Sequence, residues 1–587
     1  MARDGLFESY IYTFSQSTIL YCDSDPKPEA APTSMRKTRS SNNINNADLV
    51  RFAIHSNDKL DEQRNSSINQ TADKDLSHHT DIVYNPRRRG HDAHLSRAIT
   101  SSNSSITSHY ANKIFEITCI IVMISCFAIL ILFAFFAGIK EVNSMIHVEK
   151  AITDRDLHSN SFKDEECSIE IVESIPKILK YPQNAVKHPA TYDAWNSILG
   201  LIDQKNGKIS SISNQDIKIA SAYWTLRSSD VNPVNQTKPN AAEGETILAE
   251  LKRIAQSGGA KLTIVNSYPG SISQGNDTDE LEAAGAELRL LNMPQLVGAG
   301  ILHTKLLVNN ATKSLYIGSA NMDWRSLTLV KEMGLHFSTC PTLTNDMLKI
   351  FTSYYIMATP TSALPNSWPK ALATHINQSN PLNINLQGIY SQVYISVSPP
   401  EFLTEGRTGD LDAILDIMQK SNKFIYIAVM DYVPGFLYDP SFEYWPTINN
   451  EILIRSINHD IEVKLLVSKW QSTRDIEITF LKSLDELRNI SNVQIKLFEF
   501  PKPIGPYIEY TLVNHNKYMV TDNCGYIGTN NWSADYFTNT GGIGIIVNQT
   551  EAIQQNPSIY NDTIQEQLRQ VFLRDWNSDY ASFLSDY

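Results

Sequence analysis

Two segments of the chain carry the same pair of basic side chains at the same spacing. His303 and Lys305 are separated by one residue in HTKLLVNN, and His515 and Lys517 have the same separation in HNKYMVTD. Alternate residues of a β-strand point to the same face, so each histidine should lie beside its lysine. Two imidazoles and two ammonium groups around one phosphate could cleave a phosphodiester.

In such a site one imidazole can attack phosphorus and form a covalent phosphohistidine. The other can protonate the leaving oxygen and then take a proton from water in the second step. The lysines would offset negative charge on the non-bridging oxygens. This chemistry requires neither a metal nor another cofactor. A bell-shaped pH profile is expected, because one imidazole must start neutral and the other protonated.

A second pattern follows each of these segments. YIGSAN contains Ser319 and Asn321, and YIGTNN contains Thr529 and Asn531. We expect a hairpin to return each pattern to the site, where the hydroxyl and amide groups could donate to phosphate oxygens. The glycine would let the backbone approach the ligand closely. The recurrence of both patterns favours one shared site over coincidence.

The chain repeats its order of elements from Cys167 onward. The apolar runs at 217–226 and 260–265 have counterparts at 424–434 and 462–467. Runs that are rich in β-branched and aromatic residues and apolar on both faces predict strands buried between helix layers. The amphipathic stretches at 242–259 and 445–460 predict helices between them.

These elements predict an α/β fold of the α/β/α sandwich type, built from two halves related by a pseudo-twofold axis. The halves would span 166–383 and 384–587. The join is expected in the segment 359–383, which is rich in Pro, Ser and Asn. Bringing the halves together would place the two His/Lys pairs around one anion.

The residues before this body predict a membrane anchor. Positions 117–139 contain no charged residue, and as a helix of about 35 Å they could cross a bilayer. The run begins too far into the chain for a cleaved signal peptide, so we interpret it as a signal anchor. Residues 1–115 have the composition of a disordered tail, and 140–165 would form a stalk. Three arginines at 87–89 favour a cytoplasmic N-terminus.

Composition limits the partners of the folded body. The formal net charge of −13 argues against a general polyanion-binding surface, so any phosphate recognition must be local. Three cysteines, Cys167, Cys340 and Cys524, would allow one disulfide and one free thiol in an oxidising lumen. Sequons after the anchor permit a lumenal body, and the candidate glycosylation sites are Asn235, Asn276, Asn310, Asn377, Asn489, Asn548 and Asn561.

The two motifs resemble those of the phospholipase D superfamily, in which the pattern HxKxxxxD occurs twice. The segments SANMDWRSLTLVKEMG, VNHNKYMVTD, YIGTNNWSADYFTNT and VFLRDWNSDY are similar to the type II membrane branch of that superfamily. The resemblance covers essentially all of 166–587. It implies a lysosomal enzyme that acts as a 5′ exonuclease on single-stranded DNA and RNA, or as a phospholipid hydrolase and transphosphatidylase.

The resemblance also implies a location and a set of partners. The chain would be a single-pass type II membrane protein that travels from the endoplasmic reticulum and Golgi to the late endosome and lysosome. Its partners would be a single-stranded nucleic acid or a phospholipid substrate. A homodimer and proteolytic release of a soluble form are both compatible with the sequence.

Roles for the motif residues follow from the same resemblance. His303 is expected to be the nucleophile, and His515 the general acid and base. Glu332 stands where related sites place a carboxylate that orients an imidazole, and the alternative for it is a solvated charge at a strand edge. Cys167 and Cys340 are similar to the disulfide partners of the branch. The remaining residues carried over as catalytic are Lys305, Lys517 and Asp522.

Asn310 departs from the pattern, because the family places an aspartate at this position. Asp and Asn both cap turns by bonding to nearby backbone amides, so the change need not disturb the strand. If the aspartate instead tunes the charge of the lysine or imidazole, its loss would slow catalysis. We favour retained activity, because every group with a direct chemical role is present. The alternative is a catalytically weakened membrane glycoprotein.

Aromatic side chains cluster near the site segments and could stack on bases, which would suit single-stranded nucleic acid. Core packing is the alternative for each of them. The aromatic residues near the motifs include Tyr536 and Phe537, and the candidates for stacking are Tyr223, Trp224, Trp324 and Trp532.

Overall fold

The computed structural model describes residues 166–200, 214–230, 239–269, 276–439, 441–503 and 505–586. All of them belong to the second of two compact units, which comprises residues 123–587. The predicted tail, anchor and stalk lie outside these residues. Within the described ranges, every helix is too short or too polar to cross a bilayer.

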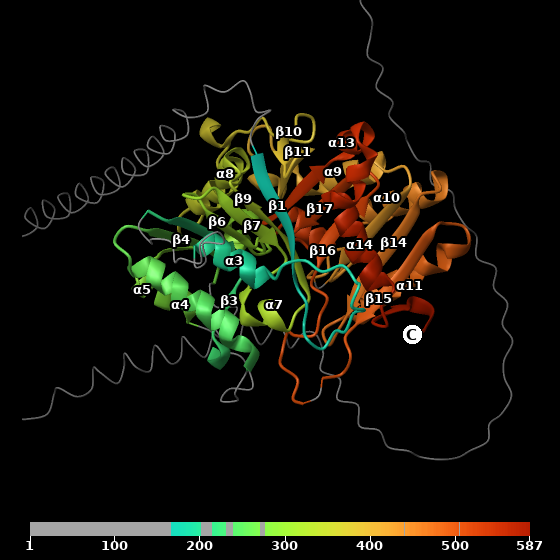
Figure 1. Cartoon of the computed structure of the whole chain (residues 1–587), viewed down its shortest axis with the longest axis horizontal. Helices are drawn as coiled ribbons and strands as arrows, with labels where there is room; N and C mark the ends of the chain where they lie inside the picture. The colour runs from blue at the N-terminus through green and yellow to red at the C-terminus, as the bar shows by residue number, and fades with distance from the viewer. Residues whose placement is uncertain are drawn as a thin grey trace, which may run out of the picture. The chain divides into compact units, whose positions relative to one another are not determined.

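A mixed sheet forms the first half of the body (Figure 1). Three of its strands are parallel neighbours and the other neighbours are antiparallel. The order across this sheet is β1 (Glu166–Ser174), β9 (Glu332–Ser338), β7 (Ser314–Gly318), β6 (Leu306–Asn309), β2 (Asp216–Ser221), β4 (Lys261–Ser267) and β5 (Glu287–Leu291).

The second sheet repeats this order, with an extra strand at each end. Its strands are β10 (Leu382–Leu386), β11 (Ile389–Ser398), β18 (Gly542–Asn548), β17 (Cys524–Gly528), β16 (Lys517–Thr521), β13 (Phe424–Val429), β14 (Glu462–Lys469), β15 (Val493–Glu499) and β19 (Ala581–Phe583). The α/β class and the duplication are therefore as predicted. A short parallel pairing of β1 with β10 connects the two sheets.

Helices cover both sheets, and their amphipathic faces supply much of the core. The longer ones are α3 (Thr191–Leu199), α4 (Ala242–Gln256), α8 (Pro341–Met357), α9 (Asp410–Lys420), α11 (Asp475–Asp485) and α14 (Ile564–Trp576). The shorter ones are α5 (Asp277–Ala283), α6 (Met293–Val297), α7 (Trp324–Thr328), α10 (Thr447–Leu453), the π-helical turn η6 (Ile454–Asn458), α12 (Ala534–Thr538) and α13 (Thr550–Gln555).

The largest hydrophobic cluster is shared by the two sheets. Leu306 and Ile317 of the first sheet belong to it together with Ile395 and Ile545 of the second. Separate clusters lie under α3 and α4 in one half and under α9 and α11 in the other. Burial on both faces explains why the strands read as continuous apolar runs rather than alternating ones.

Buried charges also join the two ends of the body. Glu173 in β1 receives the guanidinium of Arg574 in α14 at 2.7 Å, and Asp575 pairs with Lys331 at 2.7 Å. All four residues are buried or nearly so. In Figure 1, β1 (cyan) lies between the olive-green strands of the first half and the orange and red elements of the second half. The network therefore fastens the first strand to the last long helix.

The cysteines pair as the resemblance implied. Cys167 and Cys340 form a disulfide between β1 and the start of α8, and Cys524 is a buried free thiol.

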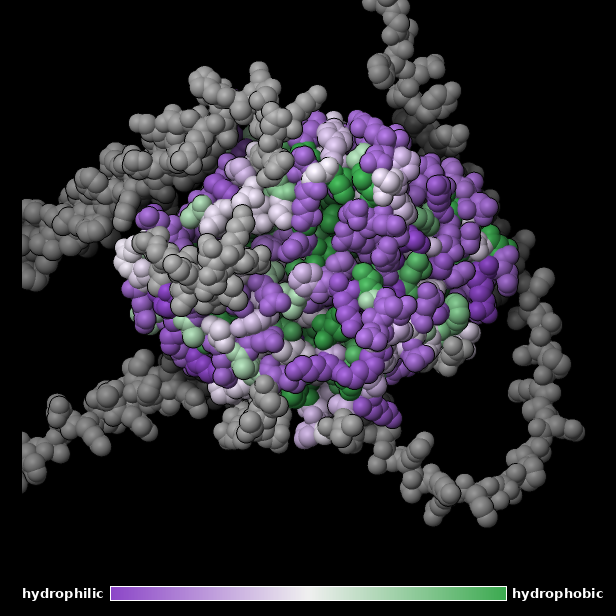
Figure 2. Space-filling view, viewed as in Figure 1, coloured by the Kyte–Doolittle hydropathy of each residue, from purple (hydrophilic) through white to green (hydrophobic). Residues whose placement is uncertain are grey.

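The described surface is mostly hydrophilic on the face seen in Figure 2, and hydrophobic residues are visible among the hydrophilic ones.

Candidate active site

The backbone that leads into each motif is bonded to the opposite half. The amide of His303 donates to the carbonyl of Gly541 at 2.7 Å, and the amide of His515 donates to the carbonyl of Lys331 at 2.8 Å. In return, the amide of Gly541 donates to the carbonyl of Ile301 at 2.9 Å, and the amide of Lys331 donates to the carbonyl of Val513 at 3.0 Å. Gly541 immediately precedes β18 and Lys331 immediately precedes β9, so the two halves use equivalent positions. The two motif segments therefore lie on one seam.

The four motif side chains form a single site. Burial lowers the pKa of the His303 imidazole well below its ordinary value, and the nearby charges of Lys305, Lys517 and His515 lower it further. The pKa of His515 is lowered in the same way, by burial first and then by the two lysines. Charges act this strongly only over a few ångströms in a buried setting. These mutual effects, together with the backbone bonds across the seam, agree with the expected convergence of the two imidazoles.

Each motif lysine turns back toward its own histidine. Lys305 donates from Nζ to the carbonyl of His303 at 2.6 Å, and Lys517 donates to the carbonyl of His515 at 2.7 Å. Burial lowers the pKa of Lys305 well below its usual range and that of Lys517 to about 7. A phosphate anion among these groups would raise all four pKa values, because its charge favours the protonated forms.

Glu332 is part of this site. Its Oε2 lies 2.8 Å from Nδ1 of His515, and its side chain is fully buried. Burial raises the pKa of Glu332 to about 7, against the opposing charge of Lys517. The alternative of a solvated charge at a strand edge is therefore wrong. The carboxylate holds the Nδ1 side of the ring and leaves Nε2 for chemistry.

Among its described residues, the second half offers no such carboxylate to His303. The position equivalent to Glu332 is Gly542, and Nδ1 of His303 is buried without a hydrogen-bond partner in the described structure. A Cβ atom on Gly542 would lie 2.1 Å from Oδ1 of Asn530. Asn530 is held there by Ser398 at 2.8 Å and Asp410 at 3.0 Å. The two histidines therefore have different surroundings, although their motifs match.

The last position of each motif lies far from the chemistry. Oδ1 of Asp522 accepts the backbone amides of Asn422 and Lys423 at 3.0 and 3.2 Å, next to the start of β13. Asn310 donates from Nδ2 to Asp216 at 2.8 Å at the corresponding place in the first half. Five residues of strand separate this position from the lysine, which is roughly 16 Å. The expected catalytic role of Asp522 is wrong, because its side chain caps a turn.

Asn310 therefore does not remove a catalytic group. Its Oδ1 also accepts a hydrogen bond from Lys313 at 2.6 Å, so the amide is engaged at both ends. The same engagement weakens Asn310 as a glycosylation candidate. Asn235 lies outside the described residues, Asn377 and Asn548 are half-buried, and the exposed candidates are Asn276, Asn489 and Asn561.

The hydroxyls predicted to bind phosphate have other partners. Ser319 donates to the carbonyl of Met333 at 3.1 Å and accepts its amide at 3.0 Å. Thr529 makes the equivalent pair of bonds with Ile543 at 3.3 and 3.0 Å. These hydroxyls fix the turn to the neighbouring strand, and the prediction that they donate to phosphate is wrong. The backbone of each turn instead faces the histidine of the opposite half.

The glycine of this pattern is also needed for packing inside the protein. A Cβ atom on Gly318 would lie 2.5 Å from the Cα of Gly334 and from the hydroxyl of Tyr316. The absent side chain therefore makes room for the sheet, and not for a ligand as expected.

The two predicted asparagines differ. Nδ2 of Asn531 donates to Asp431 at 2.7 Å and to the hydroxyl of Tyr536 at 3.2 Å, so both of its N–H groups are engaged. Oδ1 of Asn321 and Oδ1 of Asn531 are both buried without a hydrogen-bond partner in the described part of the chain. Phosphate binding by Asn321 stays a prediction, whereas Asn531 is an internal link of the site.

Asp431 is a site residue that the sequence did not identify. It lies just beyond β13, separated from Val429 by Met430, and it is buried. Burial raises its pKa to about 6, while the nearby charge of Lys517 opposes the rise. The pKa of the buried Glu477 is raised to about 8, by burial first and by the nearby charge of Asp431 second. A polar residue at the end of a buried strand was the available signal, since Tyr223 occupies the equivalent position in the first half.

The aromatic predictions need correction. Trp224, Trp324 and Trp532 are almost fully buried in the core, so they cannot stack on a base. Tyr223 is half-buried, and its hydroxyl donates to Asp323 at 3.2 Å. Tyr536 is the aromatic side chain that reaches the chemistry, because its ring lies edge-on to His303 with 5.0 Å between the ring centroids.

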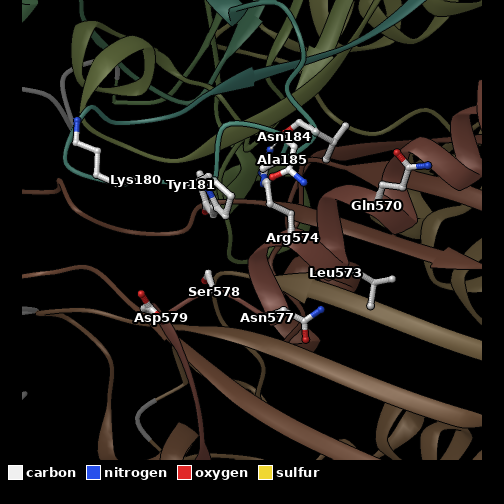
Figure 3. A pocket seen from close by; sticks show the side chains of 12 residues that line it. Lys180, Tyr181, Asn184, Ala185, Gln570, Leu573, Arg574, Asn577, Ser578 and Asp579 are labelled. Carbon is white, nitrogen blue, oxygen red and sulfur yellow. Dashed lines mark hydrogen bonds between the residues drawn. The ribbon is translucent and has the colours of Figure 1, made fainter.

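A surface cavity of about 480 Å³ lies away from the motifs, between the segment 180–186 and α14 (Figure 3). Arg574 lines it, but its guanidinium is already bonded to Glu173 and to Asp575. The charge available for an anion is therefore small. None of the four motif residues lines this cavity.

Comparison with known proteins gives consistent matches over the folded body. The family model described as "PLD3/4, PLD-like domain" matches residues 199–503. A Xenopus tropicalis protein named 5'-3' exonuclease PLD3 is 41% identical over 422 residues, which are 71% of this chain and 81% of the relative. Mouse 5'-3' exonuclease PLD4 is 37% identical over 71% of this chain and 79% of its own length. Human 5'-3' exonuclease PLD3 is 37% identical over 71% and 80%.

Proposed function

Because this chain belongs to the PLD3/4 family of phospholipase D-like proteins and is a phosphodiesterase of that type, we propose that it removes nucleotides from the 5′ end of single-stranded DNA or RNA. The relatives named as 5'-3' exonucleases support this substrate class. The observation that carries the proposal is the buried contact between Glu332 and His515 across the seam, beside His303. It supplies two imidazoles, of which only His515 has a carboxylate beside it, around one phosphate.

His303 is the proposed nucleophile. Its pKa is lowered well below the ordinary value, so the ring is neutral and its lone pair can attack phosphorus. A bond forms between the imidazole nitrogen and phosphorus, and the bond from phosphorus to the leaving oxygen breaks. Lys305 and Lys517 stabilise the charge on the non-bridging oxygens. The product of this step is a phosphohistidine.

His515 is the proposed general acid and base. Burial and the two lysines lower the pKa of His515 in the site without substrate, and a bound phosphate would raise it. The carboxylate of Glu332 at 2.8 Å then stabilises the protonated ring, which can give its proton to the leaving oxygen. The neutral ring then takes a proton from water, and the resulting hydroxide attacks phosphorus and releases His303. Glu332 acts here as the carboxylate does in a Ser-His-Asp triad, by orienting the imidazole and stabilising its charged form.

We place the catalytic body in an acidic lumen. The uncharged run 117–139 supports a type II anchor, and the disulfide between Cys167 and Cys340 is typical of an oxidising compartment. The exposed sequons of the described body agree with entry into the secretory pathway. The family resemblance points to the lysosome.

The test uses the full-length protein, solubilised in detergent, at acidic pH with EDTA and a 5′-hydroxyl single-stranded oligonucleotide. The parent should release mononucleotides, and His303→Ala and His515→Ala should each lose at least about 10³-fold in rate. His336→Ala is the matched control, since His336 is buried in β9 beside Glu170 and outside the site. Its rate should stay within about threefold of the parent's.

A phospholipid offered with an alcohol acceptor is the second arm. Turnover of lipid but not of the oligonucleotide would replace the exonuclease assignment with a transphosphatidylase. Silence toward both substrates would favour the weakened glycoprotein.

A further inference from the structure

One large aromatic side chain combines exposure with a chain of contacts to the catalytic seam. Tyr438 exposes 55% of its surface, although its neighbours Leu437 and Tyr432 are buried. Its hydroxyl lies 3.1 Å from the hydroxyl of Tyr536, and the two ring centroids are 6.0 Å apart. Tyr536 in turn meets the imidazole of His303 edge-on. A single aromatic side chain, that of Tyr536, therefore lies between Tyr438 and the proposed nucleophile His303.

The backbone around Tyr438 is held rigidly. Asp535 accepts the amides of Leu437 and Tyr438 at 2.6 and 3.3 Å. Arg474 donates to the carbonyl of Leu437 at 2.6 Å, which places its guanidinium carbon 4.7 Å from the centroid of the Tyr438 ring. A fixed ring needs little ordering when a ligand stacks on it, so more of the stacking energy appears as affinity.

We propose that Tyr438, with Arg474 beside it, is the platform on which a nucleobase of the strand stacks while its phosphate lies between the two motif histidines. This inference rests on the proposed function and adds a binding residue to it. An aromatic face accepts any base, which suits an exonuclease without sequence preference. A cation next to the ring attracts the adjacent phosphate backbone. The edge-on contact of its ring with the Tyr536 ring, at 6.0 Å between centroids, places Tyr438 near His303.

The platform replaces the stacking residues expected from sequence. The three tryptophans adjacent to the motifs are in the core, whereas Tyr438 lies on the segment that follows β13 and has no motif of its own. Tyr444 offers a matched control. It is 56% exposed and stacks on Phe480 at 6.1 Å, and within the described ranges no hydrogen bond or ring contact joins it to the motif residues.

The experiment compares the full-length parent with Tyr438→Ala, Tyr438→Phe and Tyr444→Ala on three substrates. Two are 5′-hydroxyl oligonucleotides that differ only in a base or an abasic site at the terminal nucleotides. The third is methyl 4-nitrophenyl phosphate, a phosphodiester without a nucleobase. The parent should prefer the base-bearing strand. Tyr438→Ala should raise KM for that strand by about 5- to 100-fold, the range expected for one lost stacking contact.

The other outcomes separate the platform from the activity. Tyr438→Phe and Tyr444→Ala should stay within about threefold of the parent, and Tyr438→Ala should keep its rate on the base-free ester. Equal loss on all three substrates, or equal effects of Tyr438→Ala and Tyr444→Ala, would overturn the platform alone. A parent that cleaves the ester but neither oligonucleotide would overturn the nucleic-acid substrate, and the platform with it.

Discussion

Glu332 and His515 are contributed by opposite halves of the chain and meet at 2.8 Å, whereas the equivalent residues Gly542 and His303 make no such contact. A duplicated fold thus carries an unequal pair of histidines. This difference matters for the reaction. The general acid must be an imidazole that is readily protonated, whereas the nucleophile must be an imidazole that stays neutral.

Replacing Glu332 by Gln should lower kcat by about 10²- to 10⁴-fold with little change in KM, because the amide cannot stabilise the imidazolium of His515. Steady-state kinetics on a single-stranded oligonucleotide measure the effect. Glu170→Gln is the control, since Glu170 of β1 pairs with His336 of β9, the strand that also carries Glu332. If Glu332→Gln retained kcat within threefold, the assigned role of this carboxylate would be wrong.

Restoring the family's aspartate at position 310 should not improve the enzyme. Asn310→Asp removes the hydrogen bond to Asp216 and sets two carboxylates against each other, so we expect a loss of about 1–2 kcal/mol in the free energy of unfolding. The rate per folded molecule should stay within about threefold. Thermal unfolding and kinetics together test this. A gain of tenfold or more in rate would instead indicate that the aspartate tunes the catalytic charges.

Glu477 should make the folded state less stable as pH rises. Its pKa is raised from the ordinary value to about 8, so the folded state holds a proton that the unfolded chain releases above pH 4–5. The stabilisation is complete below that range and is lost as pH rises through about 8, at up to about 1.4 kcal/mol per pH unit. Glu477→Gln should flatten this dependence, measured by urea unfolding between pH 5 and 8.

Two outcomes of the same titration would oppose that account. A slope that is unchanged in Glu477→Gln would place the titrating group elsewhere. A slope that is lost equally in Glu443→Gln, a substitution at an exposed glutamate, would show that the effect is one of net charge.

Removing Arg574 should lower the free energy of unfolding more than removing most other charged residues. Arg574→Met leaves Glu173 and Asp575 buried without their shared cation, and we expect a loss of about 3–5 kcal/mol. Arg569→Met on the same helix is the matched control, because its pair with Glu566 is partly exposed and should contribute less than about 1 kcal/mol. Denaturant midpoints measure both. Equal losses in the free energy of unfolding would mean that both substitutions act by disturbing α14, and not through the buried ion network.

The sequence predicted the elements better than their contacts. Strand and helix periods located β2, β4, β13, β14 and α4, and the repeated His/Lys pairs located the chemistry. The hydroxyls of Ser319 and Thr529 were misassigned, because a short pattern does not show whether a donor meets a ligand or the next strand. Trp324 was misassigned since exposure depends on packing that arrives from elsewhere in the chain. Asp431 could be assigned to the site only from the structure, in which β13 pairs with β16, the strand that begins at Lys517.

The pairing of Glu173 with Arg574 has a consequence for biosynthesis. The two residues are separated by 401 positions, so the acid emerges from the ribosome long before its cation exists. Until then the first strand carries a carboxylate that is expensive to bury. The first half therefore cannot complete this buried pair until α14 has been made, and a chain cut before α14 would leave Glu173 without its cation.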